Sequence, residues 1–238
     1  MKYAVIFDFD DTLVNTREVK RLQHKAVARE VYGIELTDET FLKYWGLPYD
    51  ETLRRYYQNS DSIENMRAAK LRYEDAFPVF ANESAIKVVS QLLAGGAQVC
   101  VLTSSDKERV VTDLKRLGFP VEQLSYIQAS NDTRVHKPHA AVFGPVLQYL
   151  KSLGINIGEI WYVGDDIRDA EAARGAGIKF IGVTSGLVTS QEFLAYGVQN
   201  ISNNLEEVLE IIRRRFWRHA GFGKSSRAIN GWGAEPYR

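Results

Sequence analysis

The chain has 238 residues, 45% hydrophobic and 25% charged, with 30 basic and 30 acidic side chains that cancel. This composition is that of a soluble globular protein, and the zero net charge argues against binding to nucleic acid or to an anionic membrane surface. Cys100 is the only cysteine, which excludes a disulfide within the chain and indicates a reducing compartment. Because no segment has the pattern of a signal peptide or a bilayer span, we expect a cytoplasmic protein.

The N-terminal segment predicts a buried strand. The run from Tyr3 to Phe7 is apolar and rich in strand formers, and polar residues follow it directly. Asp8, Asp10 and Asp11 therefore lie at the carboxyl end of a core strand, where open α/β sheets bind ligands. Like charges are costly to bury together without a cation, so a bound Mg²⁺ would explain the three carboxylates. A solvated acidic turn would explain them equally well.

The next segment predicts a helical insertion. Apolar residues recur there at helical spacing, no convincing strand interrupts them, and the block ends near Pro78. Thr37 and Asp61 are suitable N-caps, and Gly33 is a suitable stop. The expected helices are 19–31, 38–44, 49–58 and 62–77.

From Asn82 onward the pattern alternates between helix and strand, which predicts a parallel sheet with crossover helices. The expected fold is α/β, a Rossmann-like parallel sheet core with an inserted all-helical domain. We expect the core to comprise residues 1–14 and 82–216 and the insertion residues 15–81, followed by a tail at 217–238. The expected strands after the insertion are 98–102, about 126–127, 160–163 and 179–183, and the expected helices are 83–93, 107–117, 141–153, one ending near 177, and 205–216.

The tail contains many glycines and serines, so the default expectation is a mobile end. It also carries Trp217, Phe222, Trp232 and Tyr237, which could dock on the core or on a second subunit.

Polar side chains follow the other predicted strands too. Thr103 and Ser104 come directly after one strand, where hydroxyl and N–H groups at a helix start can hold an anion. Lys137 projects from a loop before a proline. Asp165 and Asp169 repeat the crowded carboxylate pattern at a further strand end. Taken singly, helix capping and a solvated lysine are the competing interpretations.

The conjunction of these clusters is more specific than any one of them. The carboxyl ends of parallel strands meet on one face of a sheet, so acids, hydroxyls and a lysine should converge there. Transfer of a phosphoryl group needs such a set: a nucleophile, a metal, and cations or donors around the spreading negative charge.

These motifs resemble those of the haloacid dehalogenase superfamily, in particular its phosphatases with a helical cap. The resemblance covers residues 1 to about 215, and the motifs occur in the family's order. They are Asp8-Phe9-Asp10-Asp11-Thr12, Thr103, Lys137-Pro138 and Gly164-Asp165-Asp166-Ile167-Arg168-Asp169, and the run Ala172-Ala173-Arg174-Gly175-Ala176-Gly177 is typical of relatives resembling phosphoglycolate phosphatase.

The resemblance implies roles for two leading carboxylates and a metal site. Asp8 would be the nucleophile that forms an aspartyl-phosphate, and Asp10 would act as acid and then base. Mg²⁺ would be held by Asp8, the backbone carbonyl of Asp10, and Asp165. Asp169 would complete the acidic side, through water or by orienting Lys137.

The resemblance also implies a phosphate site. Thr103 and the Ser104 N–H would bind phosphate oxygens, while Lys137 would balance the charge of nucleophile and phosphate. The family's dehalogenases lack the second aspartate, so the presence of Asp10 argues for a phosphatase. Asp11 departs from the glycine that is frequent at its position, which adds local negative charge.

The helical cap would close over this site, exclude water and select the substrate. Gly46-Leu47-Pro48 resembles the family's cap loop that faces the core. Arg17, Lys43, Arg54 and Arg55 could read a second anionic group, although a solvated helix face is the favoured interpretation of each. A closing lid implies a substrate of metabolite size.

The leading prediction is a Mg²⁺-dependent phosphatase of small-molecule phosphate monoesters. A phosphosugar mutase resembling beta-phosphoglucomutase would use the same residues, and an inactive binding module of the same fold is the third alternative. The expected partner is a small phosphorylated metabolite, with no nucleic acid and no membrane, and the protein is expected to be a monomer or homodimer.

Overall fold

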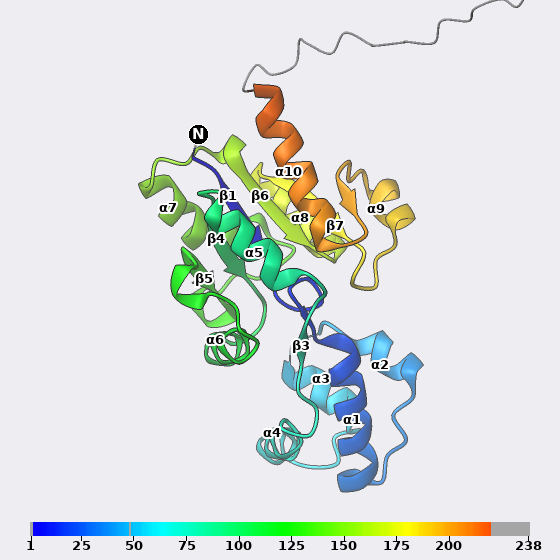
Figure 1. Ribbon diagram of the computed structural model, residues 1–238. Helices are drawn as coiled ribbons and strands as arrows, with labels where there is room; N and C mark the ends of the chain where they lie inside the picture. Colours follow the sequence, from blue (N-terminus) through cyan, green and yellow to red (C-terminus); the bar gives the residue numbers. More distant parts are fainter. Residues whose placement is uncertain (1, 48, 220–238) are drawn as a thin grey trace, which may run out of the picture.

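The structure is a computed structural model that describes residues 2–47 and 49–219 (Figure 1). At its centre is a six-stranded sheet in the order β5-β4-β1-β6-β7-β8, and every pairing in it is parallel. This arrangement confirms the predicted α/β class. The strands are β1 (Ala4–Phe7), β4 (Gln98–Leu102), β5 (Tyr126–Gln128), β6 (Ile160–Gly164), β7 (Lys179–Val183) and β8 (Ile201–Ser202).

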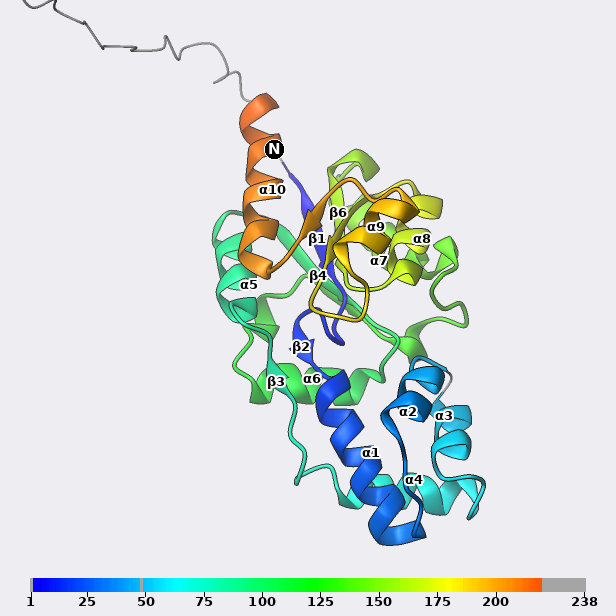
Figure 2. The same cartoon turned by 90° about the vertical axis from the view of Figure 1, so that its right-hand side faces the viewer.

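Helices cover both faces of this sheet (Figures 1 and 2). One face packs against α5 (Ala85–Ala94), α6 (Lys107–Arg116) and α10 (Leu205–His219), and the other against η3 (Ala140–Phe143), α7 (Gly144–Ser152) and α8 (Ile167–Ala176). The side chains of β1 alternate between the two cores: Val5 and Phe7 face α5, while Ala4 and Ile6 face α7. The other elements that follow residue 81 in the chain are η1 (Val121–Gln123), η2 (Ser130–Asp132), η4 (Ile157–Glu159) and α9 (Ser190–Tyr196).

The inserted segment forms a separate group of helices below the sheet in Figure 1. Its elements are α1 (Arg17–Tyr32), α2 (Asp38–Tyr44), α3 (Tyr49–Tyr56) and α4 (Ile63–Arg72). These helices bury an apolar cluster of their own, which includes Val27, Phe41, Leu53, Tyr57 and Met66. The insertion therefore has an apolar core of its own.

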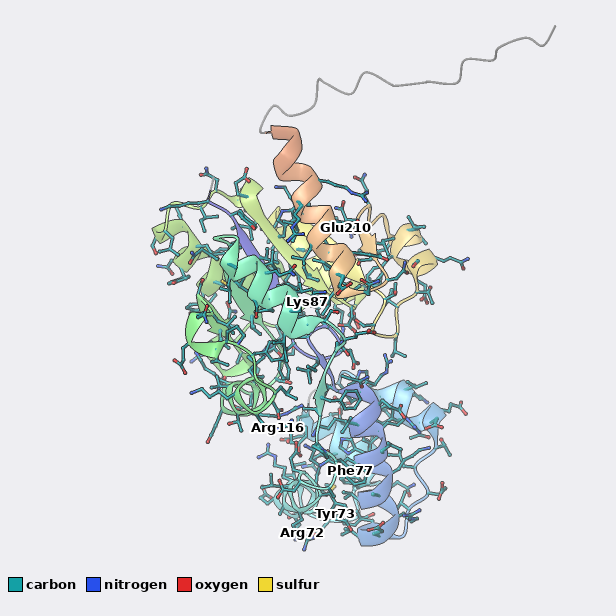
Figure 3. All side chains as sticks on the ribbon, in the orientation of Figure 1. Arg72, Tyr73, Phe77, Lys87, Arg116 and Glu210 are labelled. Atoms are coloured by element: carbon teal, nitrogen blue, oxygen red, sulfur yellow. The ribbon has the colours of Figure 1, made fainter. Side chains whose placement is uncertain are left out.

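Two short strands join this group to the sheet. β2 (Val14–Asn15) pairs antiparallel with β3 (Phe80–Ala81), so both connections leave together (Figure 2). Arg116 of α6 lies at this boundary in Figure 3, and its guanidinium donates a 2.8 Å hydrogen bond to the Val79 carbonyl. The sequence pattern predicts neither strand, because two-residue pairings are too short for any periodicity to register.

Several predicted boundaries are wrong in detail. α3 ends at Tyr56 rather than residue 58, because Gln58 and Asn59 adopt left-handed backbone with φ of 51° and 52°. α4 ends at Arg72 rather than at residue 77, where the chain continues in tight turns.

The N-cap of α4 is Ser62 and not Asp61, since the Ser62 hydroxyl accepts the backbone N–H of Asn65. The predicted cap Thr37 of α2 is confirmed by its bond from the Thr40 N–H. α9 and β8 are absent from the sequence prediction because both are short.

α10 continues to His219, three residues beyond its predicted end, so Trp217 belongs to a helix rather than to a tail. The other aromatic residues of the predicted tail, Phe222, Trp232 and Tyr237, lie outside the described residues. Among the described helices, none combines the length and apolar character that crossing a membrane requires.

Candidate active site

The carboxyl ends of the central strands bring the predicted residues together. β1 lies between β4 and β6, with Phe7 opposite Val101 and Val163, and the Asp8 N–H bonds to the Val163 carbonyl at 2.8 Å. Asp8 and Asp165 therefore emerge side by side from adjacent strands. They line a cavity of about 580 Å³ between the sheet and the inserted helices, together with Asp10, Ser104, Lys137 and Asp169.

Lys137 connects two of the acids. Its ammonium lies 2.9 Å from Asp8 Oδ1 and 2.7 Å from Asp169 Oδ1, and all three side chains are largely buried. Burial alone would lower the pKa of Lys137, but the two carboxylates outweigh it and raise the pKa above its usual value. Lys137 is therefore a fixed cation beside Asp8 and Asp169.

Asp169 is held from three sides. Its Oδ1 accepts hydrogen bonds from Lys137 and from the Tyr162 hydroxyl, and its Oδ2 accepts the Asp166 N–H at 3.2 Å. Gly164 permits this position, since a Cβ at residue 164 would stand 2.5 Å from Asp169 Oδ2. Asp169 thus orients Lys137 in addition to extending the acidic cluster.

Three carboxylates form a group suited to a metal ion. One oxygen each from Asp8, Asp165 and Asp169 lies within 4.8 Å of the others. Burial, with the negative charges of its neighbours, raises the pKa of Asp8 to about 8 against the opposing effect of Lys137, and it raises the pKa of Asp165 as well. A divalent cation would relieve this repulsion, and an all-oxygen donor set fits Mg²⁺. The Thr12 hydroxyl donates to Asp165 at 3.2 Å and so helps to fix it.

The Asp10 side chain stands apart from this group. Its Oδ2 accepts a 2.6 Å hydrogen bond from Ser105 and a longer one of 3.5 Å from Thr103, and Arg109 lies 3.7 Å from its Oδ1. Oδ1 itself is buried and accepts no hydrogen bond. Asp10 therefore lines the cavity with one carboxylate oxygen that accepts no hydrogen bond and lies next to Arg109.

Of the predicted phosphate-binding residues, Ser104 and Lys137 line the cavity and Thr103 lies behind them. Thr103 is buried, and its hydroxyl oxygen accepts the Ser105 N–H at 3.0 Å. This bond holds the turn in which Ser104 and Ser105 face the cavity. Thr103 thus supports the turn that carries Ser104 and Ser105, but it is not among the residues that line the cavity.

Sequence reasoning missed several residues of the site. Ser105 could have been found, because it completes the hydroxyl triplet that begins at Thr103. Arg109 lies inside α6 and Tyr162 inside β6, where an arginine and a tyrosine carry no signal of a site. Gly186, in the loop after β7, passes so close to Asp165 that a Cβ there would overlap its carboxylate.

Residues of the inserted segment line the far side of the cavity. The Gly46 carbonyl accepts a 3.1 Å hydrogen bond from Arg168 of α8, whose guanidinium is also bound by both oxygens of Asp166. Gly46 has a φ of 86°, and a Cβ there would lie 2.8 Å from the Arg168 guanidinium, so only glycine permits this approach. The predicted cap loop therefore faces the core at Gly46 and Leu47.

The four basic residues proposed from the sequence to read a second anionic group do not line the cavity. Arg17 pairs with Asp11 at 3.8 Å, while Lys43, Arg54 and Arg55 are exposed, which agrees with the favoured interpretation of a solvated face. Lys20, His24 and Lys70 line it instead.

Comparison with known proteins agrees with this geometry. The profile of haloacid dehalogenase-like hydrolases matches residues 5–183. A candidate PpaX pyrophosphatase from Clostridium perfringens is 27% identical over 212 residues, which cover 88% of this chain and 95% of that protein. A phosphoglycolate phosphatase from Yersinia pseudotuberculosis is 29% identical over 196 residues, which cover 77% of this chain and 81% of that protein.

Among solved structures, a candidate beta-phosphoglucomutase from Thermotoga maritima superposes with a TM-score of 0.75 at 22% identity, covering 89% of this chain and 99% of that one. At this identity the likeness concerns the fold alone. The family profile spans all four motifs from β1 to β7. The chain therefore belongs to the haloacid dehalogenase-like hydrolases, and it is an enzyme resembling the phosphatases of that family.

Proposed function

We propose that this protein is a Mg²⁺-dependent phosphatase that hydrolyses small-molecule phosphate monoesters through an aspartyl-phosphate on Asp8. The observation that carries the proposal is the position of the Asp8 carboxylate. It lies on the cavity wall, 2.9 Å from the Lys137 ammonium and within the acidic group of Asp165 and Asp169, with Asp10 two residues further along.

In the first step a carboxylate oxygen of Asp8 attacks phosphorus, and the bond from phosphorus to the ester oxygen breaks. Asp10 donates its proton to that leaving oxygen. In the second step Asp10 accepts a proton from water, whose oxygen attacks the aspartyl-phosphate, releasing phosphate and restoring the Asp8 carboxylate. The contacts of Asp10 with Ser105 and Arg109 support this role, since they hold the carboxyl group in place while its Oδ1 accepts no hydrogen bond.

The other residues would neutralise charge. Mg²⁺, held by Asp8, Asp165 and the backbone carbonyl of Asp10, with Asp169 on the same side, would supply positive charge beside the nucleophile and the phosphate. Lys137 would offset the remaining negative charge, and Ser104 would donate its N–H to a phosphate oxygen. Thr103 would support that oxygen site through its hydrogen bond to the Ser105 N–H.

The size of the cavity favours metabolites. About 580 Å³ is room for a small ligand, and the Arg168–Gly46 contact joins the inserted segment to the core at the cavity wall. We accordingly propose residues 15–81 as a cap on a catalytic core of residues 1–14 and 82–216, with the protein acting in the cytoplasm as a monomer or homodimer.

The test is phosphate release from a metabolite panel, measured with Mg²⁺ and with a chelator. The panel should contain phosphoglycolate, pyrophosphate, sugar phosphates and nucleotides, in view of the relatives' names. We expect turnover with Mg²⁺ that stops with the chelator. Interconversion of hexose phosphate isomers without net phosphate release would identify a mutase instead, and silence on all substrates would contradict both.

A further inference from the structure

The cap contributes a second charged group to the cavity, which the proposed chemistry does not use. It consists of Lys20 of α1, Lys70 of α4 and Glu74, which follows α4. Both lysines line the cavity although their side chains are only 4% and 9% exposed. Lysines so deeply buried are rare unless something compensates their charge.

The compensation within the protein is incomplete. Lys20 and Lys70 both bind Glu74, at 2.5 Å to Oε1 and 2.7 Å to Oε2, so two positive charges share one carboxylate. Gln23 donates a 3.0 Å hydrogen bond to Glu74 Oε2, which fixes this arrangement. His24 also lines the cavity but stays neutral at physiological pH, because burial and the neighbouring Lys70 and Lys20 lower its pKa to about 3. Two buried lysines therefore share a single carboxylate in this part of the cap.

Arg109 is a further cation of this cavity. It lines the cavity from the core side, where its Nη2 lies 3.7 Å from Asp10 Oδ1 and its Nε lies 3.6 Å from Asp113 Oδ2. Burial, together with the charges of Lys70 and Arg109, lowers the pKa of Lys20 to about 7 despite the opposing effect of Glu74. An anion placed among these groups would relieve their mutual repulsion and stabilise the charged form of Lys20.

We propose that Lys20 and Lys70 form a binding site for a second anionic group of the substrate, on the cap side of the cavity opposite Asp8. The preferred substrates are then phosphate esters or anhydrides that also carry a carboxylate or a second phosphoryl group. Neutral alcohol or sugar portions leave the excess positive charge unpaired. This inference rests on the proposed phosphatase function and specifies its substrate class.

The experiment compares two substrates that differ in one charge. Phosphoglycolate carries a carboxylate where 2-hydroxyethyl phosphate carries a hydroxymethyl group. Since a hydrogen bond to a charged group is worth about tenfold to a hundredfold in binding, wild-type kcat/KM should be higher for phosphoglycolate by about that factor. Equal values for the two substrates would overturn the inference without need of any variant.

The variants Lys20→Met and Lys70→Met test whether these two lysines cause the preference for phosphoglycolate. Each should raise KM for phosphoglycolate by about tenfold or more, while kcat/KM for 2-hydroxyethyl phosphate should stay within about twofold. Lys43→Met is the matched control, because Lys43 is an exposed cap lysine that does not line the cavity. Losses that are equal for both substrates would show that the lysines only support the fold. If wild-type protein released phosphate from neither substrate nor from the wider panel, the proposed function itself would fail.

Discussion

The Tyr162 hydroxyl donates a 2.9 Å hydrogen bond to Asp169 Oδ1, the same oxygen that lies 2.7 Å from the Lys137 ammonium. The Lys137 nitrogen also lies 5.6 Å from the centre of the Tyr162 ring. Tyr162 comes from the middle of β6, so a core residue fixes the orientation of the acid that in turn positions the lysine. The Tyr162 side chain thereby connects the buried sheet to the charged pair of Asp169 and Lys137.

Tyr162→Phe should weaken both stability and turnover. Removing a buried hydrogen bond to a charged group costs about 1–3 kcal/mol in the free energy of unfolding, measured by denaturant titration. Because Asp169 keeps its bonds from Lys137 and the Asp166 N–H, kcat should fall by about tenfold rather than vanish. Tyr149→Phe, at a tyrosine that stacks on Tyr126, is the control and should change kcat little. Wild-type kcat in Tyr162→Phe would show that the hydrogen bond has no positioning role.

The variants Asp8→Asn and Asp10→Asn should distinguish the roles of the two leading carboxylates of the first motif. Asp8→Asn removes the nucleophile, so almost no turnover should remain. Asp10→Asn should lose about 10²–10⁴-fold in kcat, the usual contribution of one acid–base group. Rapid quench with a radiolabelled phosphate ester should trap label on wild-type protein and none on Asp8→Asn. Full activity of Asp8→Asn would rule out the aspartyl-phosphate route.

Ser105→Ala should impair the acid–base step selectively. The variant loses the 2.6 Å hydrogen bond to Asp10, leaving that carboxyl group with the long contact to Thr103 and the ion pair to Arg109. A lost hydrogen bond to a charged group corresponds to a decrease of about tenfold or more in kcat, together with a shifted pH–rate profile. A decrease in kcat with an unchanged profile would mean that Ser105 acts only through the fold.

Gly186→Ala should weaken metal binding although it changes none of the proposed metal ligands. A Cβ at this position would overlap Asp165 Oδ2, so the carboxylate must move away from the acidic group. The concentration of Mg²⁺ for half-maximal activity, or for half-maximal binding by calorimetry, should rise by about tenfold or more. Gly158→Ala is the matched control, because a Cβ there meets nothing within 4 Å. Equal Mg²⁺ requirements in the two variants would contradict the close packing of Gly186 on Asp165.

His24 should make the cap sensitive to acid. Burial and the charges of Lys70 and Lys20 lower its pKa to about 3, whereas in the unfolded chain the imidazole takes up a proton near pH 6.5. Between these pH values the unfolded state binds more protons, so the free energy of unfolding falls as the pH falls. The slope from this group is at most about 1.4 kcal/mol per pH unit.

The comparison of wild type with His24→Gln between pH 4 and pH 7 measures this contribution. The variant should show a shallower decline in stability below pH 6.5, since glutamine does not titrate. His139→Gln, at an exposed histidine, should keep the wild-type slope. Identical slopes for all three proteins would show that His24 does not govern the acid response.

The sequence by itself determined the fold class and the family resemblance from which the proposed chemistry follows. Each strand end carries its functional residues within a few positions of the strand, so the apolar runs before Asp8, Thr103 and Asp165 were sufficient to predict both the sheet and its acidic face. Tertiary structure brings one oxygen each of Asp8, Asp165 and Asp169 within 4.8 Å of one another, which makes a group that could hold a metal ion.

Tertiary structure alone decided the rest, because the remaining contacts join residues that no local pattern connects. Tyr162 acts on Asp169 through a hydrogen bond and Gly186 acts on Asp165 through close packing, yet a buried tyrosine or a loop glycine looks ordinary in sequence. Lys20 and Lys70 lie 50 residues apart on different helices and meet only through Glu74, whereas the basic residues that the sequence suggested lie elsewhere on the cap. The sequence specifies side chains and their local geometry, but which charges share a cavity depends on how the cap helices pack over the sheet.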